Sequence, residues 1–402
     1  MKILIATAGS RGDIAPYTGL GAGLLAAGHD VHVATQEEFA PMVRTAGLGF
    51  RALAEGTRRA VEPGRPRDRR ALMRSAAAFV AEIGRGFESA VEADTDLMLL
   101  SATTAPLGPH LTEATGIPAL GAHLQPNAPT GAFPPVVAGT RSLGRFGNRL
   151  AGRFALRMVD RVYAPAVRDL RARLDLPPAH GPEIRRREER AGRPVLHGFS
   201  EALVPRPADW RPGLEVVGTW WPYLGTRELP QQVEDFLAAG PPPVLVTFGS
   251  MAAGEGERLS ALAVEALRGA GLRGILQSGA AGLAADADGI LPVGDLPHEL
   301  LLPRTAGVVH HCGAGTSAAA ARAGAASVPV PVTADQPFWA ERLYRVGAAV
   351  APIPFAELTA ARLTTALRAL PEATGAPDVA ARMAAEDGTG AAVKAVERLM
   401  RD

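Results

Sequence analysis

The chain has 402 residues, of which 47% are hydrophobic and 21% are charged, a globular balance that excludes a disordered chain and predicts two or three domains. Its 42 basic and 41 acidic residues leave a net charge of +1, so bulk electrostatics gives no reason to expect nucleic acid as the main partner. The single cysteine, Cys312, excludes an internal disulfide framework.

The first half of the chain opens as a strand, a glycine-containing turn, a helix and a second strand. Residues 2–8 form a short apolar run, and residues 9–13 read Gly-Ser-Arg-Gly-Asp. The helix that follows is expected to end at Ala27, before Gly28, and the next strand is expected at residues 30–35. Further strands of this half are predicted at residues 97–101, 119–123, 195–198 and 215–217.

The second half repeats this order. An apolar run at residues 243–248 enters a Gly249-Ser250 turn, a helix is predicted at 258–269, and a strand at 273–277. Further strands are predicted at residues 307–310, 327–331 and 349–352. Because strands that alternate with helices form parallel sheets with crossover helices, we predict an α/β fold with two Rossmann-like, doubly wound domains.

The boundary between the domains is expected in a stretch rich in Trp, Pro and Gly. We place the first domain at residues 1–219, a linker at 220–230 and the second domain at 231–388. Residues 389–402 are expected to form a separate C-terminal helix. No run of about 18 apolar residues predicts a membrane-spanning helix, and the first apolar run is too short for a secretory segment, so we expect a cytoplasmic protein.

An arginine repeats every four residues in one segment of the first half, which places the series along one helix face. The series comprises Arg141, Arg145, Arg149, Arg153, Arg157 and Arg161. It is typical of a solvated helix face, and it also suits a surface that meets an anionic acceptor or a membrane. Phe146, Leu150 and Phe154 offer the partial apolar face that an interfacial helix needs, although a stripe of this kind equally suits the core.

The strongest chemical pattern lies at residues 310–317, which read His-His-Cys-Gly-Ala-Gly-Thr-Ser. A predicted strand precedes this segment and a helix follows it, so unpaired backbone N–H groups gather at the positive end of a helix dipole and form an anion site. Gly313 and Gly315 allow close approach of a phosphate, and Thr316 and Ser317 either cap the helix or donate hydroxyls to the anion. The segment is not a P-loop, because no Lys follows the glycines.

Asp335 and Gln336 follow the predicted strand at residues 327–331, at the edge where open parallel sheets bind ligands. An adjacent carboxylate and amide suit the paired hydroxyls of a sugar. Phe338 and Trp339 are more typical of packing than of ligand contact.

These residues resemble the nucleotide-sugar glycosyltransferases of the GT-B fold, in particular the bacterial branch with sterol glucosyltransferase-like and antibiotic-tailoring enzymes. The resemblance rests on Leu296-Pro-His298, Leu302-Pro-Arg304, residues 310–316 and residues 335–339, together with the turn at residues 9–13. It implies two facing domains, with the acceptor in the first and the sugar donor in the second. It also implies that the C-terminal helix crosses back to pack on the first domain.

The resemblance implies a role for each matching donor-site residue. His311 would bind the α-phosphate of the donor, and Asp335 and Gln336 would hold sugar hydroxyls. The remaining diphosphate ligands would be Gly313, Ala314, Gly315, Thr316, Ser317 and Ser250, and the base would lie against Leu296, Asp295 and His298. Asp295 stands where many relatives stack an aromatic residue on the base. Cys312 stands where close bacterial relatives have Gly, and it is either a modifiable thiol near a helix N-terminus or a small buried residue.

The implied reaction is transfer of a hexose from UDP-glucose or a dTDP-hexose to an acceptor hydroxyl, with inversion at the anomeric carbon. Asp13 is the candidate general base and Ser10 its possible helper, while Asp13 also suits a helix cap. Beyond this nucleotide-sugar co-substrate we expect no cofactor and no metal. The Asp94-Thr-Asp96 sequence resembles a metal-binding motif but stands in the wrong domain for the donor.

Residues 55–90 and 123–180 are the expected lining of the acceptor pocket, and a small lipophilic or polyketide-like natural product is the expected acceptor, in a monomer or a homodimer. Three other functions remain open at this point. They are a lipid- or sterol-directed transferase at a membrane surface, a nucleotide-sugar epimerase, and a sugar-nucleotide-binding regulator without catalysis. An NAD-dependent enzyme is disfavoured because the turn at residues 9–12 lacks the GxGxxG spacing.

Overall fold

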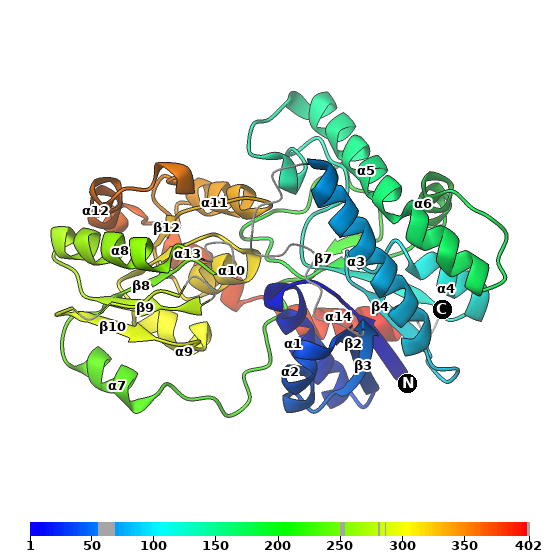
Figure 1. Ribbon diagram of the computed structural model, residues 1–402, viewed down its shortest axis with the longest axis horizontal. Coiled ribbons are helices and arrows are strands. Elements are labelled where there is room, and N and C mark those ends of the chain that lie inside the picture. Colours follow the sequence, from blue (N-terminus) through cyan, green and yellow to red (C-terminus); the bar gives the residue numbers. More distant parts are fainter. Residues whose placement is uncertain (55–68, 250–253, 280–281, 286, 400–402) are drawn as a thin grey trace.

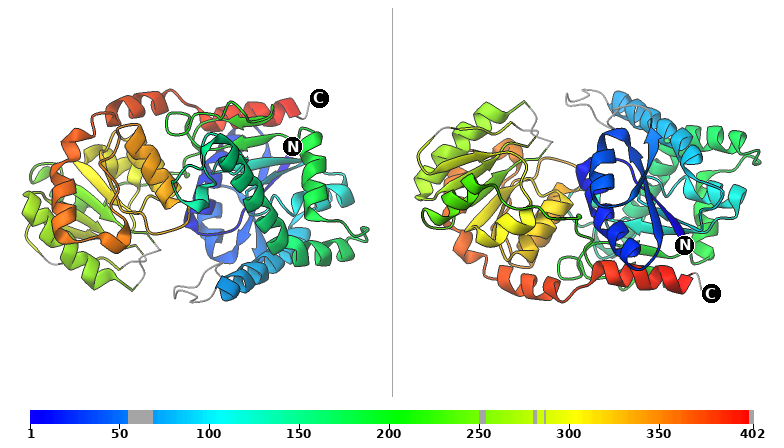
Figure 2. Two further views of the ribbon diagram at one scale, coloured as in Figure 1. Left: turned by 90° about the horizontal axis from the view of Figure 1, so that it is seen from above. Right: turned by 90° about the horizontal axis from the view of Figure 1, so that it is seen from below.

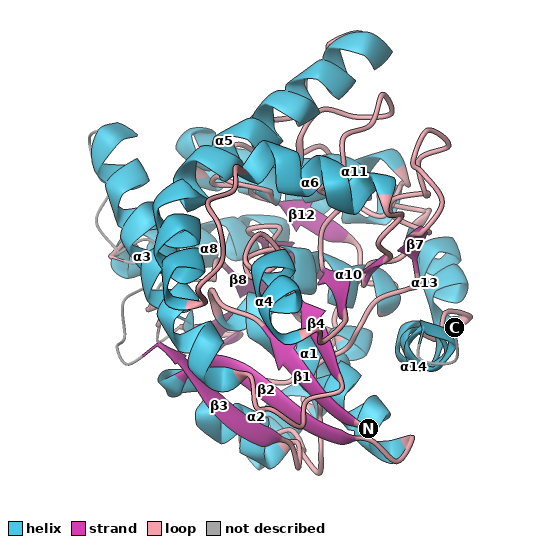
Figure 3. Ribbon diagram, turned by 90° about the vertical axis from the view of Figure 1, so that its right-hand side faces the viewer, coloured by secondary structure: helices cyan, strands magenta, loops and turns pink. Residues whose placement is uncertain are grey.

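The computed structural model describes residues 1–54, 69–249, 254–279, 282–285 and 287–399. These residues form two α/β domains that lie side by side, each with a central parallel sheet between helices (Figure 1, Figure 3). The predicted pair of doubly wound, Rossmann-like domains is therefore confirmed.

The first domain has a seven-stranded parallel sheet with the strand order β3-β2-β1-β4-β5-β6-β7. The strands are β1 (Lys2–Ala6), β2 (Asp30–Gln36), β3 (Gly49–Ala54), β4 (Leu97–Leu100), β5 (Ala119–His123), β6 (Val195–His197) and β7 (Leu214–Val216). The helices are α1 (Arg11–Ala26), α2 (Ala40–Thr45), α3 (Arg69–Ala90), α4 (Gly108–Thr115), α5 (Gly144–Arg173) and α6 (Gly181–Arg190). All four residues of β4 are buried, as expected for a strand covered by helices on both faces.

The second domain has a five-stranded parallel sheet with the order β10-β9-β8-β11-β12. The strands are β8 (Val244–Thr247), β9 (Gly274–Gln277), β10 (Ile290–Val293), β11 (Gly307–His310) and β12 (Ser327–Pro329). The helices are α7 (Gln231–Ala238), α8 (Gly256–Ala270), α9 (His298–Leu301), α10 (Ala314–Arg322), α11 (Gln336–Arg345), α12 (Ala360–Arg368) and α13 (Ala376–Ala384). Within the described residues, no helix is long and apolar enough to cross a membrane.

Three strand predictions were wrong or missing. The predicted strand at 349–352 is reduced to a single bridge between Ala349 and Ser327. The strands β3 and β10 were not predicted, although both lie at sheet edges. Pro292 within β10 argues against a strand in sequence, yet an edge strand tolerates proline because one side of it needs no hydrogen bonds.

The C-terminal helix α14 (Gly388–Leu399) lies along the first domain, far in sequence from its neighbours (Figure 2). Its Ala392, Ala395 and Val396 join a buried cluster with Tyr17 and Leu20 of α1. The predicted return of the C-terminal helix to the first domain is therefore confirmed.

The chain crosses between the domains twice, and the two crossings touch. A Cβ atom on Gly388, at the start of α14, would lie 2.6 Å from the carbonyl carbon of Gly218. The indole Nε1 of Trp220 donates a hydrogen bond of 3.1 Å to the carbonyl oxygen of Gly388. Gly218 has a φ of +96°, a backbone conformation that favours glycine. The crossings are thus packed backbone against backbone.

Candidate functional site

Each sheet reverses its strand order at one point, between β1 and β4 in the first domain and between β8 and β11 in the second. Ligands of open α/β sheets bind in the crevice outside the carboxyl ends of the strands at such points. The helices α1 and α10, which follow β1 and β11, contact each other across the domains. The two reversal points therefore lie close together at the boundary between the domains.

The predicted anion site is built by the turn from β11 into α10. Gly313 is the N-cap residue, and the N–H of Ser317 is the first to bond back, to the carbonyl of Gly313 at 2.9 Å. The amides of Ala314, Gly315 and Thr316 belong to the first turn, where a helix offers no internal acceptor. Gly315 is exposed at the tip of this turn. The helix end thus presents free donors toward the domain boundary, as an anion site requires.

The ring of His311 lies against two glycine backbones. A Cβ on Gly249 would lie 2.5 Å from Cε1 of the ring, and a Cβ on Gly313 would lie 2.8 Å from Nε2. Nδ1 is buried and makes no hydrogen bond of normal geometry to a described residue. Burial lowers the pKa of His311 to about 4, so the imidazole is neutral near pH 7 and can act as a hydrogen-bond donor. Only glycine leaves room for this ring beside the helix end.

The hydroxyl side chains predicted for the phosphate differ in their surroundings. Thr316 is half-buried in the first turn of α10. Ser317 is fully buried, and its Oγ has no hydrogen-bond partner among the described residues. A hydroxyl in that position faces the protein interior, which does not favour direct phosphate contact. Ser250 lies outside the described residues.

Cys312 is a buried residue, and a thiol activated by the helix N-terminus is not what the structure shows. The side chain is inaccessible, its Sγ lies 3.5 Å from the carbonyl oxygen of His310, and its backbone φ is +64°. Burial raises the pKa of the thiol well above its usual range. Of the two alternatives open in sequence, the structure supports the small buried residue and not the modifiable thiol.

We therefore expect Cys312 to resist alkylation in the folded protein. Because the thiolate is the reactive form, iodoacetamide should modify the native thiol at least about tenfold more slowly than the thiol of the unfolded chain. Mass spectrometry of samples quenched over time, with and without denaturant, measures both rates. Equal rates would contradict the buried position.

The predicted base-binding residues form a connected polar series. The carboxylate of Asp295 pairs with Arg11 of the first domain and accepts a hydrogen bond of 3.2 Å from Nε2 of Gln277. Oε1 of Gln277 lies 2.9 Å from Nε2 of His298, whose pKa is lowered by burial. Leu296 is buried beside them. Arg11 was not singled out in sequence, since nothing local links it to a residue 284 positions away.

The two predicted sugar-binding residues, Asp335 and Gln336, have different hydrogen-bond partners. Oδ2 of Asp335 accepts hydrogen bonds from Nε2 of Gln125 at 2.7 Å and from the indole N–H of Trp339 at 2.9 Å. Burial raises the pKa of Asp335, and the charge of Asp13 raises it further. Oε1 of Gln336 instead accepts the backbone N–H groups of residues 332 and 333, so its amide nitrogen is the part left for a ligand. Trp339 packs as predicted, but it also orients Asp335.

Gln125 is a second cross-domain residue that sequence reasoning missed. It follows β5 in the first domain and reaches Asp335 in the second. Its place after a strand end was the available sequence feature, but parallel strands of this kind end in many polar residues. Only the folded domains bring it to Asp335.

Asp13 lies in the first turn of α1, at the carboxyl end of β1. Its Oδ2 accepts both the backbone N–H and the hydroxyl of Ser10, each at 2.8 Å. Ser10 is the N-cap residue, so Asp13 caps the helix from its third position rather than from the N-cap itself. A Cβ on Gly9 would lie 2.5 Å from Oδ2, so the turn requires glycine there. Burial raises the pKa of the Asp13 carboxyl.

Asp13 lies near Asp335, one of the residues predicted to bind the sugar donor. Its charge contributes to the raised pKa of Asp335, which lies on the facing domain. Oδ1 makes no hydrogen bond to a described residue, so one carboxylate oxygen remains free. The arrangement can accept a proton from a hydroxyl held between the domains.

The Asp94-Thr-Asp96 sequence lies at the amino end of the strands of the first sheet, opposite the end that carries Asp13. Asp94 pairs with the ammonium group of Lys2, and a carboxylate oxygen of Asp96 accepts the backbone N–H of Lys2 at 2.7 Å. Both contacts gather at the start of β1, away from the carboxyl end of that strand. Across the described part of the chain, no three His, Cys, Asp or Glu residues lie close enough together to hold a metal ion.

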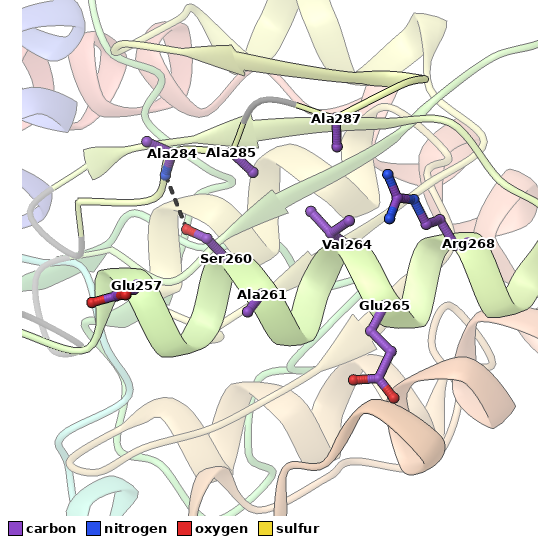
Figure 4. Close-up of a pocket in the computed structure, with 9 residues that line it drawn as sticks. All are labelled: Glu257, Ser260, Ala261, Val264, Glu265, Arg268, Ala284, Ala285 and Ala287. Carbon is purple, nitrogen blue, oxygen red and sulfur yellow. Dashed lines mark hydrogen bonds between the residues drawn. The ribbon is translucent and has the colours of Figure 1, made fainter.

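A shallow depression on α8 lies apart from this site (Figure 4). The side chains that line it include Glu257, Ser260, Val264 and Arg268 of α8, and they face Ala284, Ala285 and Ala287. None of them belongs to the predicted site, and the hydrogen bond from the N–H of Ala284 to Oγ of Ser260, 3.0 Å long, closes one side. The depression is an outer surface of the second domain.

Two family models match the chain. The glycosyltransferase family 28 N-terminal domain matches residues 3–134, and the erythromycin biosynthesis protein CIII-like C-terminal domain matches residues 276–397. The O-mycaminosyltylonolide 6-deoxyallosyltransferase of Streptomyces fradiae is 38% identical over 390 residues, which cover 92% of this chain and 89% of that enzyme.

Two further proteins are similar over nearly the whole chain. A sterol 3-beta-glucosyltransferase of Arabidopsis thaliana is 30% identical over 424 residues, covering 98% of this chain and 65% of that enzyme. Among solved structures, the glycosyltransferase SsfS6 of Streptomyces sp. SF2575, complexed with thymidine diphosphate, aligns with a TM-score of 0.63 at 21% identity. The alignment covers 99% of each chain, so the whole two-domain fold is shared.

Proposed function

The chain belongs to the GT-B glycosyltransferases of the antibiotic-tailoring branch, and from that premise we propose that it transfers a hexose from a dTDP- or UDP-sugar to a hydroxyl of a small lipophilic natural product, with inversion and without a metal. The observation that carries the proposal is that α1, which holds Asp13 in its first turn, contacts α10 of the other domain, whose N-cap residue Gly313 lies beside the ring of His311.

The diphosphate of the donor is proposed to lie at the start of α10. The free amides of Ala314, Gly315 and Thr316 and the neutral ring of His311 are donors directed at one place. As the bond to the sugar breaks, negative charge develops on the diphosphate, and preformed donors stabilise that charge in the transition state. This arrangement would do the work that a bound metal ion does in other transferases.

Asp13 is proposed as the general base. The attacking hydroxyl must lose a proton as it bonds to the anomeric carbon, and a carboxylate with a raised pKa accepts a proton more readily than an ordinary one. The two hydrogen bonds from Ser10 hold Oδ2, which leaves Oδ1 to take the proton. Ser10 is therefore a positioning residue in this proposal.

The sugar is proposed to lie between Asp13 and Asp335. Asp335 and the amide nitrogen of Gln336 would bind its hydroxyls, and Gln125 would hold Asp335 from the acceptor side. The base would lie beside Leu296 and the series from Asp295 to His298. The complex of SsfS6 with thymidine diphosphate supports thymidine as the first nucleoside to test.

Thermal unfolding with a panel of nucleotides tests the donor site. A ligand that binds only the folded state stabilises it by about 2.7 kcal/mol at a hundredfold excess over Kd. We expect dTDP or UDP to raise the unfolding temperature, and GDP, ADP and NAD at equal concentration to leave it unchanged. The proposal would be overturned if only NAD raised the unfolding temperature, or if neither dTDP nor UDP raised it.

A second candidate acceptor is a sterol or another membrane lipid. It is favoured by the similarity to the sterol glucosyltransferase of Arabidopsis thaliana. A panel of macrolide and sterol acceptors with one radiolabelled donor separates the two classes. Donor hydrolysis without any acceptor distinguishes both from a protein that only binds nucleotide sugars, because such a protein would leave the donor intact.

A further inference from the structure

The first half of α5 carries an apolar face that no part of the described chain covers. More than half of the exposed large apolar side chains among the described residues lie between residues 137 and 159. Phe146 is 84% exposed, Phe154 57% and Leu150 54%. These three follow one another at four-residue intervals, so they form a single line along the helix.

This line lies opposite the face by which α5 is held. The buried residues of the helix are Asn148, Gly152, Tyr163, Ala166, Val167, Leu170 and Arg171. In the first half only Asn148 and Gly152 are buried. Asn148 bonds the backbone at Leu143 and Gly131, and a Cβ on Gly152 would lie 3.0 Å from Pro129. The helix is thus fixed from one side, and its apolar line points away from the protein.

Arginine side chains extend the line of Phe146, Leu150 and Phe154 along α5. Arg157 and Arg161 follow Phe154 at spacings of three and four residues, and Arg153 lies on the flank beside Leu150. All three arginines are exposed, and none forms an ion pair with a described residue. The only carboxylate in the 141–161 segment is that of Asp160, which Arg185 of α6 neutralises. The face therefore combines exposed apolar groups with arginines that no carboxylate of the described residues neutralises.

The shape of this region limits what can cover it. In Figure 3, α5 extends past the neighbouring helices at the top of the molecule, so this part of the helix protrudes. A small molecule binds in a concave pocket, and a two-fold contact between identical copies would bring the arginines of one copy against those of the other. A single line of side chains is also narrow for a protein interface, which buries roughly 800 Å² on each partner.

We propose that this face of α5 binds the surface of an anionic lipid membrane. Phe146, Leu150 and Phe154 would enter the boundary between headgroups and acyl chains, while Arg153, Arg157 and Arg161 would pair with lipid phosphates. The proposal concerns attachment only and does not depend on which acceptor the enzyme uses.

Sedimentation of the full-length protein with lipid vesicles tests the proposal. We expect it to sediment with vesicles that contain phosphatidylglycerol and much less with vesicles of phosphatidylcholine alone. Because each arginine near an anionic surface is worth about 1 kcal/mol, replacing Arg153, Arg157 and Arg161 with Gln should weaken binding about a hundredfold. The triple change of Phe146, Leu150 and Phe154 to Ser should weaken it at least about tenfold, since no side chain is left to enter the membrane.

Matched controls use the same chemistry elsewhere on the surface. Tyr344→Ser removes an exposed aromatic side chain from α11, and Arg382→Gln removes an exposed arginine from α13. Both should sediment like the unchanged protein. The unfolding temperature and the shift with nucleotide diphosphate should be equal in all variants, which excludes misfolding as the cause of any loss.

Three results would overturn the proposal. The first is equal or absent sedimentation with both kinds of vesicle. The second is loss of a concentration-dependent dimer in the serine triple variant, which would assign the face to a second copy of the chain. The third is a higher KM for a soluble acceptor in that variant with unchanged vesicle binding, which would assign it to acceptor capture.

Discussion

Asp13→Asn is expected to lower kcat by about 10²–10⁴-fold, the usual contribution of a general base, while the affinity for the nucleotide diphosphate stays unchanged. Asparagine keeps the size of the side chain and an oxygen that can accept the hydrogen bonds of Ser10, but it cannot take a proton from the acceptor hydroxyl. Single-turnover rates and nucleotide titrations measure the two quantities separately.

The pH dependence gives an independent test of the same group. Burial raises the pKa of Asp13, so the active carboxylate form is lost at a higher pH than for an ordinary aspartate. The value of kcat/KM should therefore fall as the pH decreases through this raised pKa, and the remaining activity of Asp13→Asn should lack that step. The matched control is Asp94→Asn, which removes a carboxylate at the opposite, amino end of the same strands. Near-normal transfer by Asp13→Asn would remove Asp13 from this role.

The raised pKa also has a consequence for stability. A group whose pKa is higher in the folded state binds its proton more tightly there, and the stability it contributes is lost as the pH rises through the folded pKa. Ionised Asp13 therefore lowers the stability of the folded protein near pH 7. Asp13→Asn should unfold at the same or a higher temperature, which separates lost catalysis from lost structure.

His311→Ala is expected to raise the Kd for dTDP or UDP by about 10–100-fold, because a hydrogen bond to a charged group contributes roughly 1.5–3 kcal/mol. Isothermal titration calorimetry measures this change. His180→Ala removes an exposed histidine at the start of α6 and should leave the Kd unchanged. Unchanged affinity in His311→Ala would place the phosphate elsewhere.

A second variant separates the ring's position from its chemistry. Gly249→Ala retains the imidazole but places a Cβ in the space the ring occupies, at a φ of +61° that disfavours alanine. It should weaken nucleotide binding in the same direction as His311→Ala. Affinity that survives both changes would exclude the anion site at α10.

The local half of the site could be predicted from sequence. The turns that hold Asp13 and His311 each follow a short, mostly apolar strand, and a strand–turn–helix order is sufficient to place them at the carboxyl end of the sheet, where ligands bind. The same local order predicted both sheets except for one edge strand of each, β3 and β10. Local sequence patterns predicted these elements correctly because their structure depends mainly on residues that are neighbours in the chain.

The part that joins the domains could not be predicted. Arg11 pairs with Asp295, and Gln125 bonds Asp335, over separations of 284 and 210 residues. No periodicity or motif encodes such a pair, because it depends on how two finished domains dock. The choice between a buried and a modifiable Cys312 stayed open for a related reason, since the cluster that buries this residue brings together the following helix α10 and the aromatic residues of α11.

The contact between the two chain crossings has a mechanical consequence. Because Gly218 packs against Gly388, the two crossings meet at a single point, here called the fulcrum, and do not act as two independent connections. Relative motion of the domains then reduces to a rotation about that fulcrum, and sliding of one domain along the other is suppressed. A rotation of a few degrees displaces each group in proportion to its distance from this fulcrum. The facing sides of the two domains can therefore separate widely to release product while backbone torsions change at only a few positions.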